Sequence, residues 1–160
     1  MIWSDLLCND KRQEELIVNQ CIEEGKKMPT VIRGESVHLN KTWEPNILIE
    51  KGIESTTVEN IDPPFTLTHV IIPPGVRTRP HYHANCARGQ YIIKGRLRIF
   101  SGPTQEVFDV KAGDYIYTAR GEIHSELNLS DTEPVEFVST YSGVAARELS
   151  GKVVLDPPPK

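Results

Sequence analysis

Three histidines have the spacing that could do chemistry in this chain. His81 and His83 are one residue apart, and His124 follows in a separate segment. Residues two apart in a β-strand point to the same face, so His81 and His83 would share one space that His124 must reach from another strand. Neutral imidazoles bind zinc, copper, iron and nickel, and three protein ligands leave open coordination positions, as catalytic sites do. The spacing therefore predicts a divalent metal site.

Glycines frame both histidine segments at fixed separations. The first frame reads G-x5-H-x-H-x11-G and the second reads G-x7-G-x2-H-x3-N. The fixed positions are Gly75, His81, His83 and Gly95 in the first frame, and Gly113, Gly121, His124 and Asn128 in the second. Glycine permits the tight turns that bring separate strands together. A chance pair of neighbouring histidines would not come with these frames, so the metal-site prediction is strengthened.

The two frames resemble the signature motifs of the cupin superfamily. The first motif there is a glycine, five residues, His-x-His, three or four residues, a glutamate, six residues and a glycine; the second has a Pro-x-Gly before its histidine and asparagine. The resemblance covers roughly residues 65 to 142, and two positions depart from it, because Arg88 replaces the glutamate and Ala119 the proline. The resemblance implies an all-β fold, a double-stranded β-helix or jelly-roll barrel, with a metal inside.

The departure at Arg88 changes the electrostatics of the predicted site. The resemblance implies one divalent metal ion per chain, held by His81, His83 and His124. Arg88 cannot replace a glutamate ligand, because guanidinium has no free acceptor and stays protonated. A dication about 5 Å away would repel it by about 6–7 kcal/mol at an effective dielectric of about 20. An anion must therefore lie close to Arg88, or the side chain must turn away from the metal.

Three groups could compensate the charge of Arg88. Glu126 lies two residues after His124, so it shares that strand face and could pair with Arg88 or serve as a fourth metal ligand. Gln90 lies two residues after Arg88 and could be the fourth ligand through its amide oxygen. An anionic substrate could bridge the metal and Arg88, since arginine suits bidentate recognition of anions. The alternatives to a substrate role are a structural Arg88–Glu126 pair and an outward-turned Arg88.

Composition and charge restrict the class of protein to which the chain can belong. The chain has 160 residues, 38% hydrophobic and 25% charged, enough for one domain with a buried core. Its net charge is −4 and no basic patch stands out, so nucleic acid is not an expected partner. The first residues do not resemble a signal peptide, no apolar stretch approaches a membrane span, and three cysteines without framework spacing suit reduced thiols. We expect a cytoplasmic protein with no membrane partner.

The hydrophobic pattern predicts a helix followed by many strands. Residues 10–24 carry an N-cap, an apolar stripe and a glycine stop, which places an N-terminal helical segment in residues 1–30. Short strands are expected at 31–32, 37–39 and 47–50. Longer or better-bounded strands are expected at 65–72, 80–83, 89–94, 96–100, 105–110, 114–118, 122–128 and 135–141. Residues 31–150 would form the barrel, and residues 151–160 a flexible Pro-rich tail.

A metal ion with three imidazole ligands supports several functions. By analogy with the family, we expect a non-haem Fe(II) dioxygenase acting on a small anionic or dicarbonyl substrate, with Arg88 orienting the anion and Glu126 or Tyr117 handling protons. The alternative is an isomerase, dehydratase or lyase in which zinc, nickel or manganese polarises a carbonyl and Glu126 is the base. A second alternative is a non-catalytic small-molecule-binding module. The resemblance also implies a homodimer.

Overall fold

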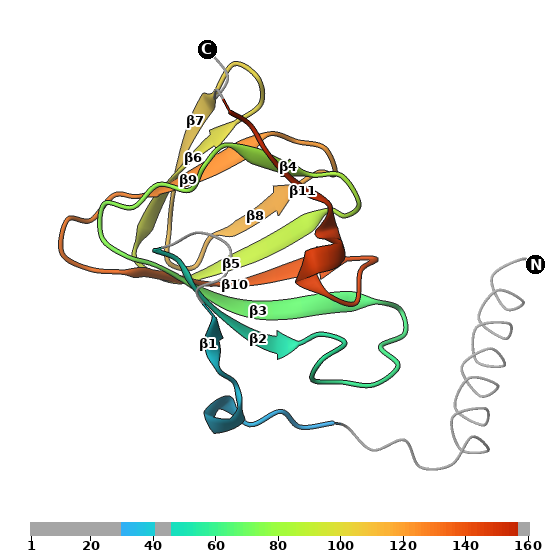
Figure 1. Cartoon of the computed structure of the whole chain (residues 1–160). Coiled ribbons are helices and arrows are strands. Elements are labelled where there is room, and N and C mark those ends of the chain that lie inside the picture. The colour runs from blue at the N-terminus through green and yellow to red at the C-terminus, as the bar shows by residue number, and fades with distance from the viewer. Residues whose placement is uncertain (1–29, 41–45, 157–160) are drawn as a thin grey trace, which may run out of the picture. The chain divides into compact units, whose positions relative to one another are not determined.

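A computed structural model describes residues 30–40 and 46–156 (Figure 1). The chain divides into two compact units, residues 1–31 and residues 32–160, and every element named below belongs to the second. The helix predicted within residues 10–24 lies outside the described residues. In the part of the chain that is described, no helix is long and apolar enough to cross a membrane.

The second unit consists of strands and two short 3-10 helices. The elements are η1 Gly34–Ser36, β1 Leu39–Asn40, β2 Leu48–Ile53, β3 Phe65–Ile72, β4 His81–His83, β5 Arg88–Lys94, β6 Arg96–Ser101, β7 Glu106–Lys111, β8 Tyr115–Thr118, β9 His124–Asn128, β10 Val135–Ser142, η2 Arg147–Ser150 and β11 Lys152–Val154. One sheet has the order β1-β2-β3-β10-β5-β8 and the other β11-β4-β9-β6-β7. Neighbouring strands are antiparallel throughout both sheets.

The chain passes repeatedly from one sheet to the other, as a double-stranded β-helix requires. β3 lies in the six-stranded sheet, β4 in the five-stranded sheet and β5 in the first again, and the alternation returns at β8, β9 and β10. The two sheets face each other in Figure 1. The predicted fold class is confirmed, and each of the strands predicted between residues 65 and 141 agrees with the structure to within two residues at either end.

Three details of the sequence prediction are wrong. The strand expected at 37–39 begins only at Leu39 and continues to Asn40. Residues 31–32 do not form a strand, although both are apolar enough to suggest one. The tail predicted from residue 151 is shorter, because Lys152–Val154 form β11 and pair with β4. A strand of three residues shows no readable alternation, so its pairing depends on the neighbouring strand rather than on its own sequence.

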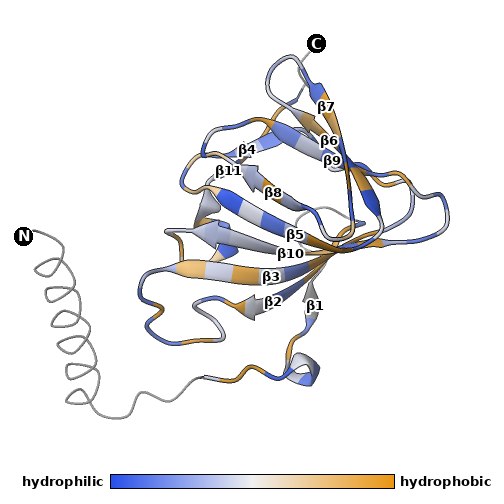
Figure 2. Ribbon diagram, turned by 180° about the vertical axis from the view of Figure 1, so that it is seen from behind, coloured by the Kyte–Doolittle hydropathy of each residue, from blue (hydrophilic) through white to orange (hydrophobic). Residues whose placement is uncertain are grey.

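The interior of the barrel is divided into an apolar part and a polar part. Figure 2 shows hydrophobic residues concentrated where β2, β3, β5 and β10 converge, and hydrophilic residues interspersed elsewhere along the strands. The apolar cluster consists of Ile47, Ile49, Val70, Ile72, Ile92, Leu97, Ile99, Val135 and Phe137. Burial of such side chains contributes about 1.5–3 kcal/mol each, so this part of the barrel stabilises the fold while the rest is available for polar groups.

The motif residue Asn128 has a structural role. Its Nδ2 donates hydrogen bonds to the carbonyl oxygens of Ile72, Pro73 and Glu133 at 3.0, 3.1 and 2.9 Å, and its Oδ1 accepts one from the Ser130 N–H at 2.9 Å. The side chain is 1% exposed. Asn128 therefore satisfies backbone hydrogen-bonding groups at the end of β3 and in the turn between β9 and β10.

Replacing Gly95 by alanine should destabilise the fold more than replacing Gly75. Both glycines have positive φ, +90° and +66°, where a side chain costs about 1–2 kcal/mol. A Cβ on Gly95 would lie 2.7 Å from Cγ2 of Val135, whereas none of the described residues comes within 4 Å of one on Gly75. Urea unfolding should give a loss of about 2–4 kcal/mol for Gly95→Ala and about 1 kcal/mol for Gly75→Ala. Equal losses in the free energy of unfolding would contradict close packing against Val135 as the reason for glycine at position 95.

Candidate metal centre

Two adjacent strands bring the three predicted histidines together inside the barrel. β4 supplies His81 and His83, β9 supplies His124, and His81 pairs with His124 across the sheet. One nitrogen from each ring lies within 4.8 Å of the other two. The three residues are only 4%, 2% and 2% exposed. The cluster predicted from spacing is therefore present, and it could hold a metal ion.

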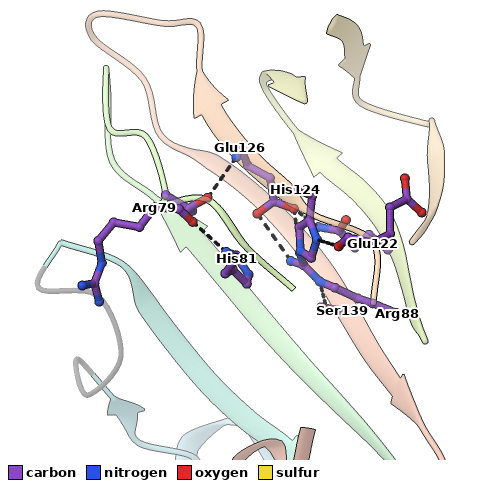
Figure 3. A network of polar contacts seen from close by, with 9 residues as sticks. Arg79, His81, Arg88, Glu122, His124, Glu126 and Ser139 are labelled. Carbon is purple, nitrogen blue, oxygen red and sulfur yellow. Dashed lines mark hydrogen bonds and ion pairs between the residues drawn. The ribbon is translucent and has the colours of Figure 1, made fainter. Parts of the chain in front are cut away.

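Backbone carbonyls orient two of the three rings. The Nδ1 of His81 lies 2.7 Å from the carbonyl oxygen of Arg79, and that of His124 lies 3.0 Å from the carbonyl oxygen of Glu122 (Figure 3). Because a carbonyl oxygen only accepts, the proton of each neutral ring is on Nδ1, and Nε2 carries a lone pair. This arrangement is the usual one for metal-ligating histidines.

The third ring, His83, is oriented by Ser150. Its Nδ1 lies 3.1 Å from the Ser150 hydroxyl, which comes from η2. Its Nε2 is buried and has no hydrogen-bond partner among the described residues. A buried polar atom without a partner costs about 1–3 kcal/mol, and a metal ion bound to Nε2 would remove that cost.

The histidines are neutral at physiological pH. Burial lowers the pKa of His83 to about 2, and the positive charge of Arg88 is the next largest cause. Burial also lowers the pKa of His81 and of His124, with the neighbouring imidazole contributing to the first and Arg88 to the second. Neutral imidazole is the form that binds a metal, so the cluster need not release protons when it does so.

Arg88 turns inward and pairs with Glu126. Its Nη1 donates to Oε1 of Glu126 at 2.8 Å, its Nη2 lies 3.4 Å from Oε2, and its Nε donates to the Ser139 hydroxyl at 3.0 Å (Figure 3). Gln90 donates a further hydrogen bond of 2.8 Å to the same Oε1. Arg88 and Glu126 are 4% and 2% exposed. Glu126, one of the three predicted compensating groups, therefore pairs with Arg88, and the predicted outward-turned Arg88 is wrong.

The Arg88–Glu126 pair extends to the histidine cluster. The Nη1 of Arg88 also lies 3.2 Å from Nε2 of His124, so it bridges the carboxylate and the imidazole. Burial alone would raise the pKa of Glu126, but Arg88, His124 and Gln90 together lower it. Glu126 is therefore ionised, and its charge cancels that of Arg88 beside the cluster.

The cluster fits a divalent ion on charge and on geometry. Three nitrogens at about 2.1 Å from one ion lie about 3.4 Å apart in tetrahedral geometry, so nitrogens within 4.8 Å of one another have to move closer when an ion binds. Nε2 of His124 has to exchange its 3.2 Å contact with Nη1 of Arg88 for the ion. The repulsion expected between a dication and Arg88 is offset by Glu126 at 2.8 Å. Gln90 and Glu126, the two predicted fourth ligands, hydrogen-bond to each other.

A cleft of about 430 Å³ extends to one member of the cluster, His124. It is lined by residues of β6, β7 and β8 together with Glu122 and His124. Tyr117, a predicted proton carrier, belongs to this lining but is 74% exposed. The next residue, Thr118, is buried and pairs with Arg88. Tyr117 therefore lies on the opposite face of β8 from Thr118, at the rim of the cleft.

Sequence reasoning missed several residues around the cluster. They are Ser139, Ser150, Glu122, Arg147 and Lys152, which contact the site or line spaces beside it. Glu122 and Ser139 could have been found from strand parity, because each lies an even number of residues from an inward-facing neighbour. The other three residues belong to a segment with no motif: Arg147, Ser150 and Lys152. The pairing of β11 with β4 places this segment beside the histidines.

Removing one histidine should abolish stable metal binding. His81→Ala and His124→Ala each leave two imidazoles, and losing one of three ligands should reduce bound metal to under about a tenth of the wild-type level after dialysis. Elemental analysis of each purified variant measures it. His38→Ala, which removes an exposed histidine, is the matched control and should retain wild-type metal. Full occupancy in either test variant would contradict the three-histidine cluster as the metal site.

The metal-free protein should lose stability as pH falls below about 6.5. The folded-state pKa of each cluster histidine is lowered, so below pH 6.5 the unfolded chain binds more protons, and each histidine contributes about 1.4 kcal/mol per pH unit. Urea unfolding of His83→Gln between pH 5 and 6 should show a slope smaller by about that amount. His38→Gln should leave the slope unchanged. An unchanged slope in His83→Gln would contradict the burial of a neutral ring.

The comparisons with known proteins identify one family over part of the chain and a shared fold. The family described as "Cupin domain" matches residues 68–141. A search of curated protein sequences found no match. Among solved structures, the polyketide cyclase RemF from Streptomyces resistomycificus superposes with a TM-score of 0.64 at 22% identity, over 82% of this chain and 90% of that chain.

Two further structures show the same fold. An RmlC-like cupin from Shewanella frigidimarina has a TM-score of 0.58 at 13% identity, over 76% of this chain and 95% of that one. Oxalate decarboxylase from Lactobacillus farciminis has a TM-score of 0.65 at 18% identity, over 84% of this chain but only 40% of that one. The motif frames, the alternation between two sheets and these matches lead to one conclusion: residues 68–141 match the cupin domain family, and the chain has the fold of these structures.

Proposed function

We propose that His81, His83 and His124 hold one divalent metal ion and that the chain is a metal-dependent enzyme for a small-molecule substrate. The observation that carries the proposal is the convergence of three buried, neutral imidazoles beside a carboxylate that Arg88 already neutralises. Three neutral ligands would leave the ion its double positive charge and open positions. A small anionic substrate with two donor atoms suits such a site.

Within this class we favour a dioxygenase that uses iron(II). Iron(II), when bound, would supply the activation of dioxygen for the oxidation of a small anionic or dicarbonyl substrate. Glu126 accepts hydrogen bonds from Arg88 and Gln90 and has a lowered pKa, which makes it a poor general base. A Lewis-acid reaction with Glu126 as base is therefore less well supported than oxygen chemistry, although zinc, nickel and manganese remain alternatives for the ion.

Arg88 is the residue we expect to orient the substrate. Its guanidinium is fixed by Ser139 and Glu126 and reaches within 3.2 Å of the Nε2 of His124. A planar group held this way can present an N–H to a substrate anion without reorganising. Tyr117, at the rim of the cleft, would handle protons only for a substrate that extends outward from the cluster.

Glu122 favours a second candidate, an isomerase, dehydratase or lyase. Its carboxylate lines the cleft beside His124 and accepts hydrogen bonds from the Ser101 hydroxyl and the Ala119 N–H at 2.5 and 3.0 Å. Neither donor is a cation, so Glu122 is better suited than Glu126 to take a proton from a substrate bound in the cleft. With zinc, nickel or manganese polarising a carbonyl, Glu122 would be the base.

We also propose a homodimer, formed through the outer face of the six-stranded sheet. Exposed apolar and aromatic side chains gather there on β3, β5 and β8, where Tyr91 and Tyr115 pack at 4.8 Å between ring centroids. Contiguous exposed patches of this kind mark interfaces. Sedimentation equilibrium of the full chain would measure the mass directly, and a monomer would contradict the proposal.

The identity of the reaction can be tested with anaerobically purified protein. We expect about one iron per chain by elemental analysis and dioxygen uptake with acetylacetone, a β-diketone, or with short carboxylates as probes. Arg88→Lys keeps the charge opposite Glu126 but loses the planar fork, so it should keep its metal while kcat/KM falls by about tenfold or more. Arg120→Lys, at an exposed arginine, is the control.

The other outcomes separate the candidates. Turnover that continues under argon and depends on zinc, nickel or manganese would replace the dioxygenase by the Lewis-acid enzyme. Tight ligand binding without turnover would indicate a non-catalytic binding module. Protein that takes up no metal even after reconstitution would contradict the proposal as a whole.

A further inference from the structure

The cleft beside His124 lies between the edges of the two sheets. β8 is the last strand of the six-stranded sheet and β7 is the last strand of the five-stranded sheet. Both strands line the cleft, together with β6, Glu122 and His124. Its volume of about 430 Å³ falls within the range of about 300–1,000 Å³ that is usual for small-molecule sites. Because one water molecule takes about 30 Å³ of liquid, a metal-binding group of a few atoms would leave most of the cleft unfilled.

The inner face of the five-stranded sheet continues onto β7, where it is not covered. Phe108 of β7 is the ladder partner of Ile99 of β6, so the two side chains share that face. Ile99 is 6% exposed, as an inward-facing residue should be, whereas Phe108 is 52% exposed. Phe108 therefore presents an aromatic ring on the concave side of the sheet that a bound molecule can cover.

Apolar side chains continue around Phe108 in the cleft. Its other apolar lining residues include Ile99, Val110, Ile116 and Tyr117, and Tyr117 is 74% exposed at the rim. Small-molecule sites are lined mainly by such hydrophobic and aromatic side chains, with few polar groups. Two aromatic rings favour an aromatic ligand, because pairs of rings attract each other beyond the effect of buried area.

The charge of the lining is negative. Glu106 and Glu122 are its two carboxylates, and the part of the chain that the structure describes contributes no lysine or arginine to it. Glu106 shares the face of its ladder partner Ser101, whose hydroxyl donates to Glu122 at 2.5 Å. Two carboxylates without a cation repel an anionic group, so the part of a ligand that lies in this cleft is uncharged.

The ladder registers give the length of a ligand that would touch both the histidines and Phe108. Ser101 of β6 pairs with His124 of β9 on one side and with Glu106 of β7 on the other. β7 is thus two strands from β9, about 10 Å at the usual strand spacing, and Phe108 lies two residues, about 7 Å, further along β7. A ligand has to extend well beyond its metal-binding atoms to cover Phe108.

We propose that this cleft binds an uncharged aromatic group of the substrate, with Phe108 as the residue that recognises it. The proposal rests on the proposed function and deepens it, because it names the substrate class as aryl-substituted dicarbonyl compounds or carboxylates. Their donor atoms face the histidines while the ring lies against Phe108. Glu106 contributes to specificity, because it disfavours a second anionic group in the cleft.

An uncharged, fluorescent bicyclic probe, 2-naphthol, tests the cleft without a metal ion. The full chain, stripped of metal by a chelator, is titrated with 2-naphthol. We expect saturable binding, with a Kd at least about fivefold weaker in Phe108→Ala. Val107→Ala is the matched control, because Val107 is 53% exposed and its side chain lies on the other face of β7. This control should bind 2-naphthol like the wild type.

Two further comparisons test the charge and the ring. Naphthalene-2-sulfonate, which adds a negative charge to the same ring system, should bind at least about fivefold more weakly than 2-naphthol, and Glu106→Gln should reduce this difference. In the metal-loaded chain, 1-phenyl-1,3-butanedione should displace 2-naphthol at a concentration at least about tenfold lower than acetylacetone does. The two diketones share their donor oxygens and differ in the ring.

The outcomes separate the aromatic site from the proposed enzyme. If the chain binds no metal but 2-naphthol binding depends on Phe108, the aromatic site stands and the proposed enzyme does not. If metal binds but 2-naphthol does not saturate, or Phe108→Ala binds it like the wild type, the aromatic site alone is overturned. Equal or tighter binding of naphthalene-2-sulfonate would overturn the uncharged assignment, and equal displacement by the two diketones would overturn the ring as part of the substrate. Should Phe108→Ala fold poorly, Tyr117→Ala at the exposed rim decides the question in its place.

Discussion

The site depends on a buried ion pair, Arg88 with Glu126. A guanidinium that is 4% exposed is tolerated in a protein interior only when a partner neutralises it, and removing one partner of a buried pair costs about 3–5 kcal/mol. The pair is formed across the barrel, because Arg88 is on β5 of one sheet and Glu126 on β9 of the other. It therefore fixes the two sheets relative to each other at the depth of the histidines, and it explains why Ser139 and Gln90 are polar there.

Much of this arrangement could be predicted from the sequence, because its signals are local. The parity of His81 and His83 and the glycine frames do not depend on any distant residue. Strand parity also placed Glu126 on the face of His124. The partner of Arg88 could not be chosen on those grounds. Glu126 and Gln90 both have the right strand parity, and strand parity says nothing about a substrate. Only the packing of the two sheets decides among them, and it brings Oε1 of Glu126 to 2.8 Å from Nη1.

The C-terminal segment could not be predicted, because its structure depends on a distant strand rather than on local signals. Its residues carry weak local signals, and the prolines that follow suggested a tail. β11 exists because β4 offers it an unpaired edge in the five-stranded sheet, a tertiary cause that no window of residues 150–156 contains. The consequence reaches the site, because Ser150 orients His83 and Lys152 faces it.

Arg88 stands in the first frame where the family usually has a glutamate. This replacement changes the charge around the site as well as removing a ligand. An acidic ligand would lower the charge of a bound ion, whereas here Glu126, a buried acid beside the histidines, is matched by Arg88. The imidazoles themselves are neutral, so an ion bound by them would keep its double positive charge. Because a low-dielectric interior does not tolerate such a charge alone, the same electrostatic argument that requires Glu126 beside Arg88 would favour an anionic ligand on the open side of that ion.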